Sequence, residues 1–374
     1  MKKIDLLFFD AGGGHRSAAN ALKEVIEQQH RPWQISLVNL QEQLDELDVF
    51  RKVTGLRLED CYNLLLNKGW TLGSPQLTRG MQWIIRLYHS RQVRVLEKVW
   101  RERQPDLLVS VVPNLNRAIF DSARNAVPRT PLVTILTDIA DYPPHFWIER
   151  QKQFLICGSG RAVEQAKALG HEDEFIFRTS GMILHPRFYE PLEIDRADER
   201  RKLGLDPERR TGLVMFGGQG SNVMLEIARS LDTQLICICG KNEKLAEKLR
   251  KLPRSSPMFV EGFTRQVPYY MRLADFFIGK PGPGSLSEAL AMKLPVIVER
   301  NAWTLPQERY NAEWIVSHQV GIVLPNFRGI AAAVAGLIEP RNYARYRAGA
   351  DALNNRAVFE IPDILEKILE GTSN

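Results

Sequence analysis

Residues 279–289 read Gly-Lys-Pro-Gly-Pro-Gly-Ser-Leu-Ser-Glu-Ala and follow directly on the apolar run Phe276–Ile278. The two prolines stiffen this loop, and its glycines leave backbone amides exposed ahead of a helix that we expect to begin at Ser285. Amide groups at a helix N-terminus favour negative charge, so the stretch predicts a strand–loop–helix unit that binds a diphosphate. Glu288, one turn into the helix, is placed to accept hydrogen bonds from two ribose hydroxyls.

Two further glycine turns join an apolar run to a helical segment. Asp10–Arg16 (DAGGGHR) follows Ile4–Phe9, and Phe216–Ser221 (FGGQGS) follows Leu213–Phe216. The first turn is neither the GxGxxG of a dinucleotide site nor a P-loop, because no Lys-Ser/Thr pair closes it. Structural capping explains one such loop, but glycine turns in two successive α/β domains that face one cleft favour nucleotide binding.

His15 is the unusual residue of the first turn. The glycines present its imidazole at the carboxyl end of the predicted strand, where it is placed to take a proton from an acceptor hydroxyl at neutral pH. The alternative is a histidine that only caps the loop.

Apolar runs alternate with helical segments along the chain, which predicts βα units with parallel sheets. The predicted strands are Ile4–Phe9, Leu107–Val112, Leu132–Leu136, Phe154–Cys157, Leu213–Phe216, Leu235–Cys239, Met258–Val260, Phe276–Ile278 and Val296–Val298. The predicted helices are Asn222–Leu231, Glu243–Leu252, Val267–Leu273, Ser285–Met292, Gln307–Val316 and one or two helices within Arg341–Gly371.

Tyr189–Arg201, a polar and charged stretch near Pro186 and Pro191, is the predicted linker. We expect a Rossmann-like domain at residues 1–190, a second at 191–345, and a C-terminal helix at 346–374 that packs back on the first domain. The 374 residues have room for two such domains. Open α/β sheets bind ligands at the carboxyl ends of their strands, so we expect the site in a cleft between the domains.

The composition, 44% hydrophobic and 25% charged, is that of a globular protein with ample core. No apolar run approaches the ~20 residues of a membrane span, and the residues Met1–Ile4 lack the apolar stretch of a signal peptide. The cysteines (Cys61, Cys157, Cys237 and Cys239) show no disulfide framework, which fits a reducing cytoplasm. Cys237 and Cys239 alternate within one predicted strand, which favours two buried thiols over a metal site.

The net charge of +6 is concentrated in one segment. Between Arg51 and Arg103 the chain has 11 Lys and Arg against 4 Asp and Glu, a balance of +7. From Leu77 to Trp100, apolar residues recur near helical spacing with basic residues between them, which predicts a helix at an anionic membrane surface. The alternative is an ordinary amphipathic helix that faces its own core. Nucleic acid is not an expected partner, because no DNA- or RNA-binding motif accompanies the charge.

A set of motifs occurs in order along residues 5–325: GGGHR, FGGQGS, ICGKNEKL, EGF, GKPGPGSLSEAL and LPQERYNA. In these motifs the chain resembles the monogalactosyldiacylglycerol synthases and bacterial diacylglycerol glucosyltransferases, and more distantly the lipid II-forming GlcNAc transferase. The resemblance implies the α/β GT-B fold, a UDP-hexose donor held mainly by the second domain, a lipid acceptor and inversion at the anomeric carbon. It implies no metal and no cofactor, since the UDP-sugar is a substrate, and the sequence indeed lacks an Asp-x-Asp triplet. With the basic segment, it predicts a cytoplasmic enzyme attached to the inner face of the cell membrane.

The resemblance also implies a role for each candidate residue. On the acceptor side, His15 matches the catalytic base with Gly12, Gly13 and Gly14 as its loop, and Asp138 is a helper or an alternative base. The implied donor-binding residues are Gly217, Gly218, Gln219, Gly220 and Ser221 beside the phosphates, Phe263 at the uracil, Gly282, Pro283, Gly284 and Ser285 at the diphosphate, Glu288 at the ribose, and Gln307 and Glu308 at the hexose.

Two departures from the family pattern leave alternatives open. The stretch Thr137–Trp147 (TDIADYPPHFW) places His145 later than the family does, so the role of His145 is open. Pro306 stands where the diacylglycerol enzymes carry Gly, so the hexose is open as well. The nearest alternative enzyme is a UDP-GlcNAc-dependent transferase or epimerase on the same fold. From another class, the alternative is a non-catalytic nucleotide-sugar-binding protein, against which the intact candidate residues argue.

Overall fold

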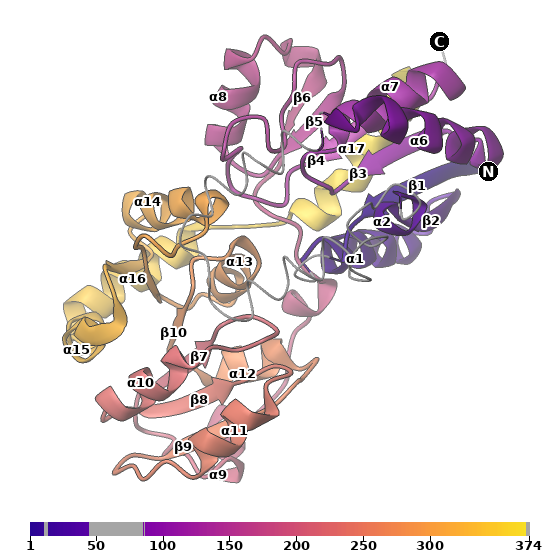
Figure 1. The fold of residues 1–374 in the computed structure, drawn as a ribbon. Helices are drawn as coiled ribbons and strands as arrows, with labels where there is room; N and C mark the ends of the chain where they lie inside the picture. The colour runs from indigo at the N-terminus through magenta and orange to yellow at the C-terminus, as the bar shows by residue number, and fades with distance from the viewer. Residues whose placement is uncertain (11–13, 45–84, 86, 372–374) are drawn as a thin grey trace. The chain divides into compact units, whose positions relative to one another are not determined.

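The computed structural model describes residues 1–10, 14–44, 85 and 87–371, and the chain forms two compact units (Figure 1). Unit 1 comprises Met1–Pro186, Leu305–Gln307 and Asn355–Asn374, and unit 2 comprises Arg187–Thr304 and Glu308–Asn354. Each unit contains one parallel sheet with helices packed against it. The predicted α/β fold class is confirmed.

Unit 1 has a six-stranded sheet in the order β2-β1-β3-β4-β5-β6. Its strands are β1 (Lys2–Phe8), β2 (Trp33–Asn39), β3 (Leu107–Ser110), β4 (Leu132–Ile135), β5 (Phe154–Cys157) and β6 (Ile176–Arg178). Its helices are α1 (Gly14–Gln28), α2 (Leu40–Leu44), α6 (His89–Arg103), α7 (Asn116–Ala126), α8 (Gly160–Ala168) and α17 (Ala357–Gly371).

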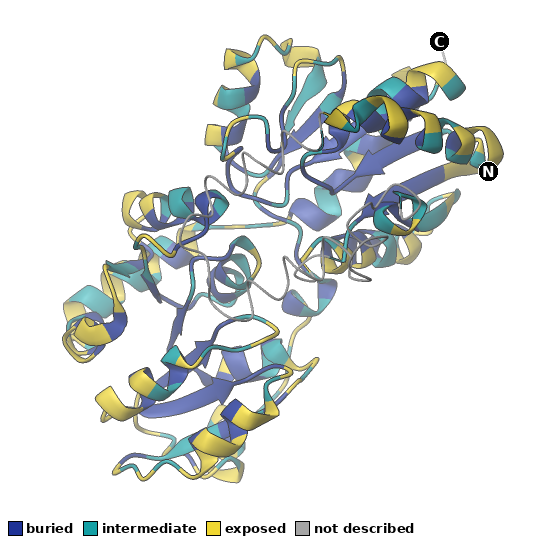
Figure 2. Ribbon diagram, viewed as in Figure 1, coloured by how far each residue is buried: buried dark blue, intermediate teal, exposed yellow. Residues whose placement is uncertain are grey.

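Helices cover both faces of this sheet, because successive side chains of a strand point to opposite faces. In β1, Ile4, Leu6 and Phe8 belong to one core cluster with residues of α1 and α17, whereas Leu7 belongs to another with residues of α6 and α7. The central strands β3 and β4 are accordingly buried along their whole length, and the outer sides of the helices are exposed (Figure 2). Helix α17 is therefore part of the core of unit 1, although it comes last in the sequence.

Unit 2 has a six-stranded sheet in the order β12-β11-β10-β7-β8-β9. Its strands are β7 (Thr211–Met215), β8 (Gln234–Ile238), β9 (Met258–Glu261), β10 (Phe276–Gly279), β11 (Val296–Glu299) and β12 (Gly321–Leu324). Its helices are α9 (Arg196–Lys202), α10 (Val223–Ser230), α11 (Glu243–Arg250), α12 (Val267–Leu273), α13 (Pro283–Ala291), α14 (Arg309–Ser317), α15 (Ile330–Ile338) and α16 (Pro340–Ala352). The predicted strands and helices are confirmed with small differences at their ends. The structure adds the strands β2, β6 and β12 and the helices α2, α7, α8, α9 and α15.

The predicted linker Tyr189–Arg201 is wrong in its second half, because α9 begins at Arg196. Asp195 caps this helix by accepting hydrogen bonds from two backbone amides of its first turn. The buried side chain of Arg200 donates to the carbonyl oxygen of Leu273 at 2.9 Å. These contacts make residues 196–202 a packed element of unit 2.

The described part of the basic segment, α6, turns its apolar side toward the core of unit 1. Val93, Leu96 and Trp100 are buried there, and the indole Nε1 of Trp100 donates to Ser122 Oγ at 2.8 Å. The exposed side is basic and carries Arg91, Arg94, Lys98 and Arg101. For these residues the ordinary amphipathic helix is the correct interpretation, and Trp100 is a core residue.

The first part of the predicted membrane helix, up to residue 84, lies outside the described residues, as does Cys61. Among the helices that the structure does describe, none is both long enough and apolar enough to cross a membrane.

Cys237 and Cys239 are buried in the same core cluster of unit 2, as predicted. Burial raises the pKa of the Cys237 thiol to about 12 and that of Cys239 to about 11. Both thiols are therefore protonated at neutral pH and contribute to packing.

Candidate active site

In unit 2, the two predicted glycine turns follow neighbouring strands. β7 and β10 pair in the centre of the sheet, with Met215 opposite Gly279. From β7 the chain continues to β8 and β9 on one side, whereas β10 lies on the other side. Open α/β sheets bind ligands at the carboxyl ends of the strands where the order reverses in this way. Turns 216–221 and 280–285 both begin at these ends.

Two positions of the first turn require glycine. Gly217 and Gly220 have φ values of 75° and 62°, in the left-handed region. A Cβ atom at Gly220 would also lie 2.7 Å from the carbonyl oxygen of Cys239. Gly218 and Gln219 form the exposed tip of the turn.

Both turns lead into helices as predicted. The Ser221 hydroxyl accepts a hydrogen bond from a backbone amide at the start of α10. Gly282 precedes α13 in an extended conformation, and Pro283 takes the first helical position, where its missing N–H is not needed. The next amides are those of Gly284 and Ser285, in a turn where N–H groups have no acceptor within the helix. An anionic group would bind at such amides.

Glu288 lies on α13 and is partly exposed. Burial raises the pKa of the Glu288 carboxyl to about 7, and the positive charge of Arg187 acts in the opposite direction. Hydrogen-bond donors such as ribose hydroxyls would favour the charged form of this carboxylate.

Glu308, the second residue of the predicted hexose pair, is buried in the short 3-10 helix η4 (Pro306–Glu308). Its Oε1 accepts a hydrogen bond from Lys280 Nζ at 2.9 Å. Gln307, in the same turn, is partly exposed. The contact places Glu308 beside the loop predicted to bind the diphosphate, since Lys280 begins that loop.

Phe263 follows the edge strand β9, and 59% of its surface is exposed. Lys241 Nζ, from the loop after β8, lies 5.8 Å from the centroid of the Phe263 ring. The residue expected at the uracil is thus at the same carboxyl edge of the sheet as the glycine turns, because all six strands run parallel.

In unit 1, His15 lies in the first turn of α1, which follows β1. Its Nδ1 is 3.2 Å from Thr137 Oγ1, and its imidazole also forms a hydrogen bond with the backbone of Val111, which follows β3. Burial of the ring lowers the pKa of His15 to about 4, although part of the residue reaches the surface. The imidazole is therefore neutral at pH 7 and able to accept a proton. The acceptor-loop residues Gly12 and Gly13 lie outside the described residues, and Gly14 begins α1.

Trp147 brings the two catalytic candidates of unit 1 together. Its indole Nε1 donates to Asp138 Oδ2 at 2.8 Å, and its ring centroid lies 5.8 Å from that of His15. Both Trp147 and Asp138 are buried. Trp147 was not among the site residues predicted from the sequence. Only its place in the stretch after Thr137-Asp138 could have indicated it.

His145, whose role the sequence left open, belongs to a turn held by Asp141. The His145 backbone has a φ of 64°, and its amide donates to Asp141 Oδ2 at 3.0 Å. Burial raises the pKa of Asp141, against the effect of the backbone amides that donate to it. Asp141 also accepts the Trp147 amide at 2.6 Å, so this turn positions Trp147.

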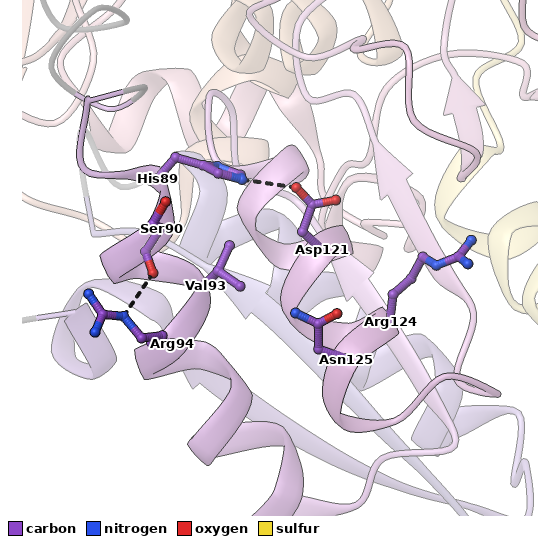
Figure 3. A pocket seen from close by; sticks show the side chains of 7 residues that line it. All are labelled: His89, Ser90, Val93, Arg94, Asp121, Arg124 and Asn125. Carbon is purple, nitrogen blue, oxygen red and sulfur yellow. Dashed lines mark hydrogen bonds and ion pairs between the residues drawn. The ribbon is translucent and has the colours of Figure 1, made fainter.

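A groove of about 530 Å³ lies between α6 and α7, away from these residues (Figure 3). His89 and Asp121 point toward each other across it, with Nε2 and Oδ2 2.9 Å apart. Arg94 and Arg124 also line it. The predicted site residues take no part in this groove.

The comparisons with known proteins agree with the motifs. Residues 213–331 match the glycosyltransferase family 28 C-terminal domain. The probable monogalactosyldiacylglycerol synthase 2 of Oryza sativa subsp. japonica is 26% identical over 393 residues, which cover 98% of this chain and 81% of that protein. The chain is a glycosyltransferase. The resemblance to the monogalactosyldiacylglycerol synthases is thereby confirmed.

Two solved structures share the fold of this glycosyltransferase. Acinetobacter baumannii MurG has a TM-score of 0.65 at 12% identity, with 98% of this chain and 100% of that chain covered. S. aureus MnaA in complex with UDP has a TM-score of 0.64 at 15% identity, with 99% and 97% covered. The glycosyltransferase therefore has the GT-B fold, as predicted.

Proposed function

We propose that this glycosyltransferase transfers galactose or glucose from a UDP-sugar to a lipid acceptor such as diacylglycerol, with inversion at the anomeric carbon. The observation that carries the proposal is the similarity to a monogalactosyldiacylglycerol synthase along 98% of the chain. The glycine turns and Glu288 of unit 2 suit the donor nucleotide, and S. aureus MnaA, a protein of the same fold, was solved with UDP.

In the proposed reaction, the acceptor hydroxyl oxygen bonds to the anomeric carbon while the bond from that carbon to the diphosphate oxygen breaks. The electron pair of the broken bond leaves with UDP, and the hydroxyl proton passes to the neutral imidazole of His15. Asp138 supports the site through Trp147 or serves as the alternative base.

The test is incubation of the protein with UDP-glucose, UDP-galactose or UDP-GlcNAc and a lipid extract, with products identified by mass spectrometry. We expect a hexosyl lipid from one of the first two donors and equal turnover with Mg²⁺ or EDTA, since we propose no metal cofactor. A GlcNAc lipid would show that the donor is UDP-GlcNAc and not UDP-glucose or UDP-galactose. Conversion of UDP-GlcNAc without any lipid product would instead indicate an epimerase.

We expect Glu288→Ala to weaken UDP binding by about 1–3 kcal/mol, the effect of losing hydrogen bonds to a charged group. Because the pKa of Glu288 is about 7, its ionised fraction in the free protein rises about tenfold from pH 6 to pH 8. The UDP affinity of the unmodified protein should therefore rise between pH 6 and pH 8 as the ionised fraction of Glu288 rises. Titration calorimetry at both pH values measures these effects.

The matched controls are Glu288→Gln, which should abolish the rise in affinity with pH, and Glu247→Gln on the exposed side of α11, which should keep it. Unchanged UDP affinity in a folded Glu288→Ala protein would remove Glu288 from the donor site.

We also propose that the protein binds the anionic inner face of the cell membrane. On α6, Arg94 and Lys98 are exposed on the side away from the core. Each basic residue near an anionic bilayer contributes about 1 kcal/mol, an attraction that salt weakens. The double variant Arg94→Glu/Lys98→Glu should therefore reduce sedimentation with anionic liposomes at least about tenfold.

The control for this experiment is Lys244→Glu/Lys248→Glu, which reverses two exposed charges of α11 in unit 2. Equal binding of the unmodified protein to neutral and anionic liposomes, or binding to neither, would contradict the membrane proposal.

A further inference from the structure

We propose that Lys280 is a donor-binding residue that contacts the diphosphate of the UDP-sugar and at the same time orients Glu308 toward the hexose. This inference rests on the proposed function. It is carried by the position of one lysine side chain between both glycine turns and a buried carboxylate.

The aliphatic part of Lys280 lies between the two turns of unit 2. A Cβ atom built on Gly217 would be 3.8 Å from Lys280 Cε, and one built on Gly282 would be 3.3 Å from the same atom. A larger residue at 282 would therefore press on the lysine. Gly282 therefore leaves room for the Lys280 side chain, whereas a Cβ atom at Gly217 would be in ordinary van der Waals contact with it.

The ammonium group and its partner differ in their access to solvent. The Lys280 side chain is 40% exposed, whereas the Glu308 side chain is 8% exposed. The Nζ–Oε1 distance of 2.9 Å is that of a charge-assisted hydrogen bond. Lys280 thus pairs with the buried Glu308 carboxylate, and its partly exposed ammonium group provides positive charge beside the two glycine turns.

Two further contacts hold Glu308 beside the loop that begins at Lys280. A Cβ atom at Gly282 would lie 3.3 Å from Glu308 Oε1, so the carboxylate sits directly against the diphosphate loop. Asn311, one turn into α14, is fully buried and donates to the carbonyl oxygen of Pro281 at 2.7 Å. This bond ties the loop that carries Lys280 to the segment that carries Glu308.

A cation at this place has a chemical purpose in sugar transfer. When the bond to the anomeric carbon breaks, negative charge develops on the diphosphate that leaves, and a fixed ammonium group stabilises that charge. The same ammonium holds the Glu308 carboxyl group in place as an acceptor for hexose hydroxyls. The alternative is that Lys280 acts only as the partner of Glu308 and never touches the donor.

Binding of uridine, UMP and UDP to Lys280→Met, Glu308→Gln and the double variant separates these two roles. We expect Lys280→Met to weaken UDP binding about 10- to 100-fold, as loss of a charge-assisted bond does. Uridine, which has no phosphate, should bind the variant as it binds the unmodified protein. The double variant should remain as weak for UDP as Lys280→Met, and Lys244→Met, an exposed lysine of α11, should behave like the unmodified protein.

Recovery of UDP affinity in the double variant would overturn the proposal, because Lys280 would then act only through Glu308. Equal weakening of uridine and UDP would overturn it too. Should Lys280→Met fail to fold, Lys280→Arg is measured in its place, because arginine keeps the positive charge. We expect Lys280→Arg to bind UDP with an affinity close to that of the unmodified protein. If the unmodified protein binds UDP no more tightly than uridine, the proposed function itself is wrong. Tight UDP binding with an unaffected Lys280→Met overturns the role of Lys280 and leaves the proposed function intact.

Discussion

We expect His15→Ala to lower the turnover number at least about 10²-fold while UDP affinity stays nearly unchanged. General base catalysis typically contributes 10²–10⁴-fold, and His15 is the candidate base of unit 1, whereas the proposed donor-binding residues belong to unit 2. Turnover is measured with saturating UDP-sugar and UDP affinity by calorimetry. His30→Asn, at the exposed residue after α1, is the matched control and should change neither quantity.

The pH dependence sharpens this prediction. An ordinary histidine would lose half of its neutral form near pH 6.5, but the pKa of His15 is lowered to about 4 by burial. The neutral base is therefore present in the free protein from pH 8 down to about pH 5, and His15 itself should cause no fall in kcat/KM over that range. The ratio kcat/KM for the donor should fall below pH 7, because Glu288 in the free enzyme is protonated there.

Other outcomes of the His15→Ala experiment have definite meanings. Loss of UDP binding with retained turnover would place His15 at the phosphates. If neither quantity changes, Asp138 becomes the leading base, and Asp138→Asn should then give the large loss. Asp138→Asn keeps an oxygen that can accept from Trp147 Nε1, so the variant tests the charge with little change in packing.

The strands that the sequence did not predict have a common position. β2 and β6 are the two edges of the sheet in unit 1, and β12 is one edge of the sheet in unit 2. An edge strand has one neighbour and a partly solvated surface: no residue of β6 is buried, and Gly321 is the only buried residue of β12. The buried central strands, such as β5 and β10, are continuous apolar runs and were predicted almost to the residue.

The candidate site follows a similar rule. The glycine turns could be predicted because their chemistry lies within a few consecutive residues at the end of an apolar run. The pair Lys280–Glu308 could not, since the fold brings together side chains from different loops, and the pair Trp147–Asp138 depends on how the single loop between β4 and β5 folds back on itself. The sequence also could not decide whether the apolar side of α6 faces the core or a membrane. An apolar stripe that faces a core and one that faces a bilayer have the same period.

Asp275→Asn is expected to lower the free energy of unfolding of unit 2 by about 3–5 kcal/mol, the usual cost of removing one partner of a buried ion pair. Asp275 directly precedes β10, and its side chain is 4% exposed. Its carboxylate accepts from the Thr211 amide at 2.8 Å and forms ion pairs with three arginines. These are Arg196, Arg200 and Arg210, at distances of 2.9, 2.7 and 3.1 Å.

The pKa of Asp275 gives the sign of the pH effect. Burial acts to raise this pKa, but the charges of Arg196 and Arg200 and the Thr211 amide outweigh it, and the pKa is lowered from its ordinary value of 3.8. The stabilisation is therefore fully present above about pH 4 and is lost as the pH falls through the lowered value. The difference between the unmodified protein and Asp275→Asn should be large at pH 7 and shrink in acid.

Urea unfolding followed by tryptophan fluorescence measures the loss, with Asp198→Asn as the control. Asp198 is an exposed residue of α9 that pairs with Arg201, and removing an exposed pair should change stability little. Equal stability of the two variants would contradict the role of Asp275. Where Asp275→Asn is still folded, it should bind UDP normally, because the length of β10 separates Asp275 from Lys280 and the glycine turns. A loss of stability at one end of this strand and a loss of UDP affinity at the other would then be separate effects of two charged clusters on a single strand.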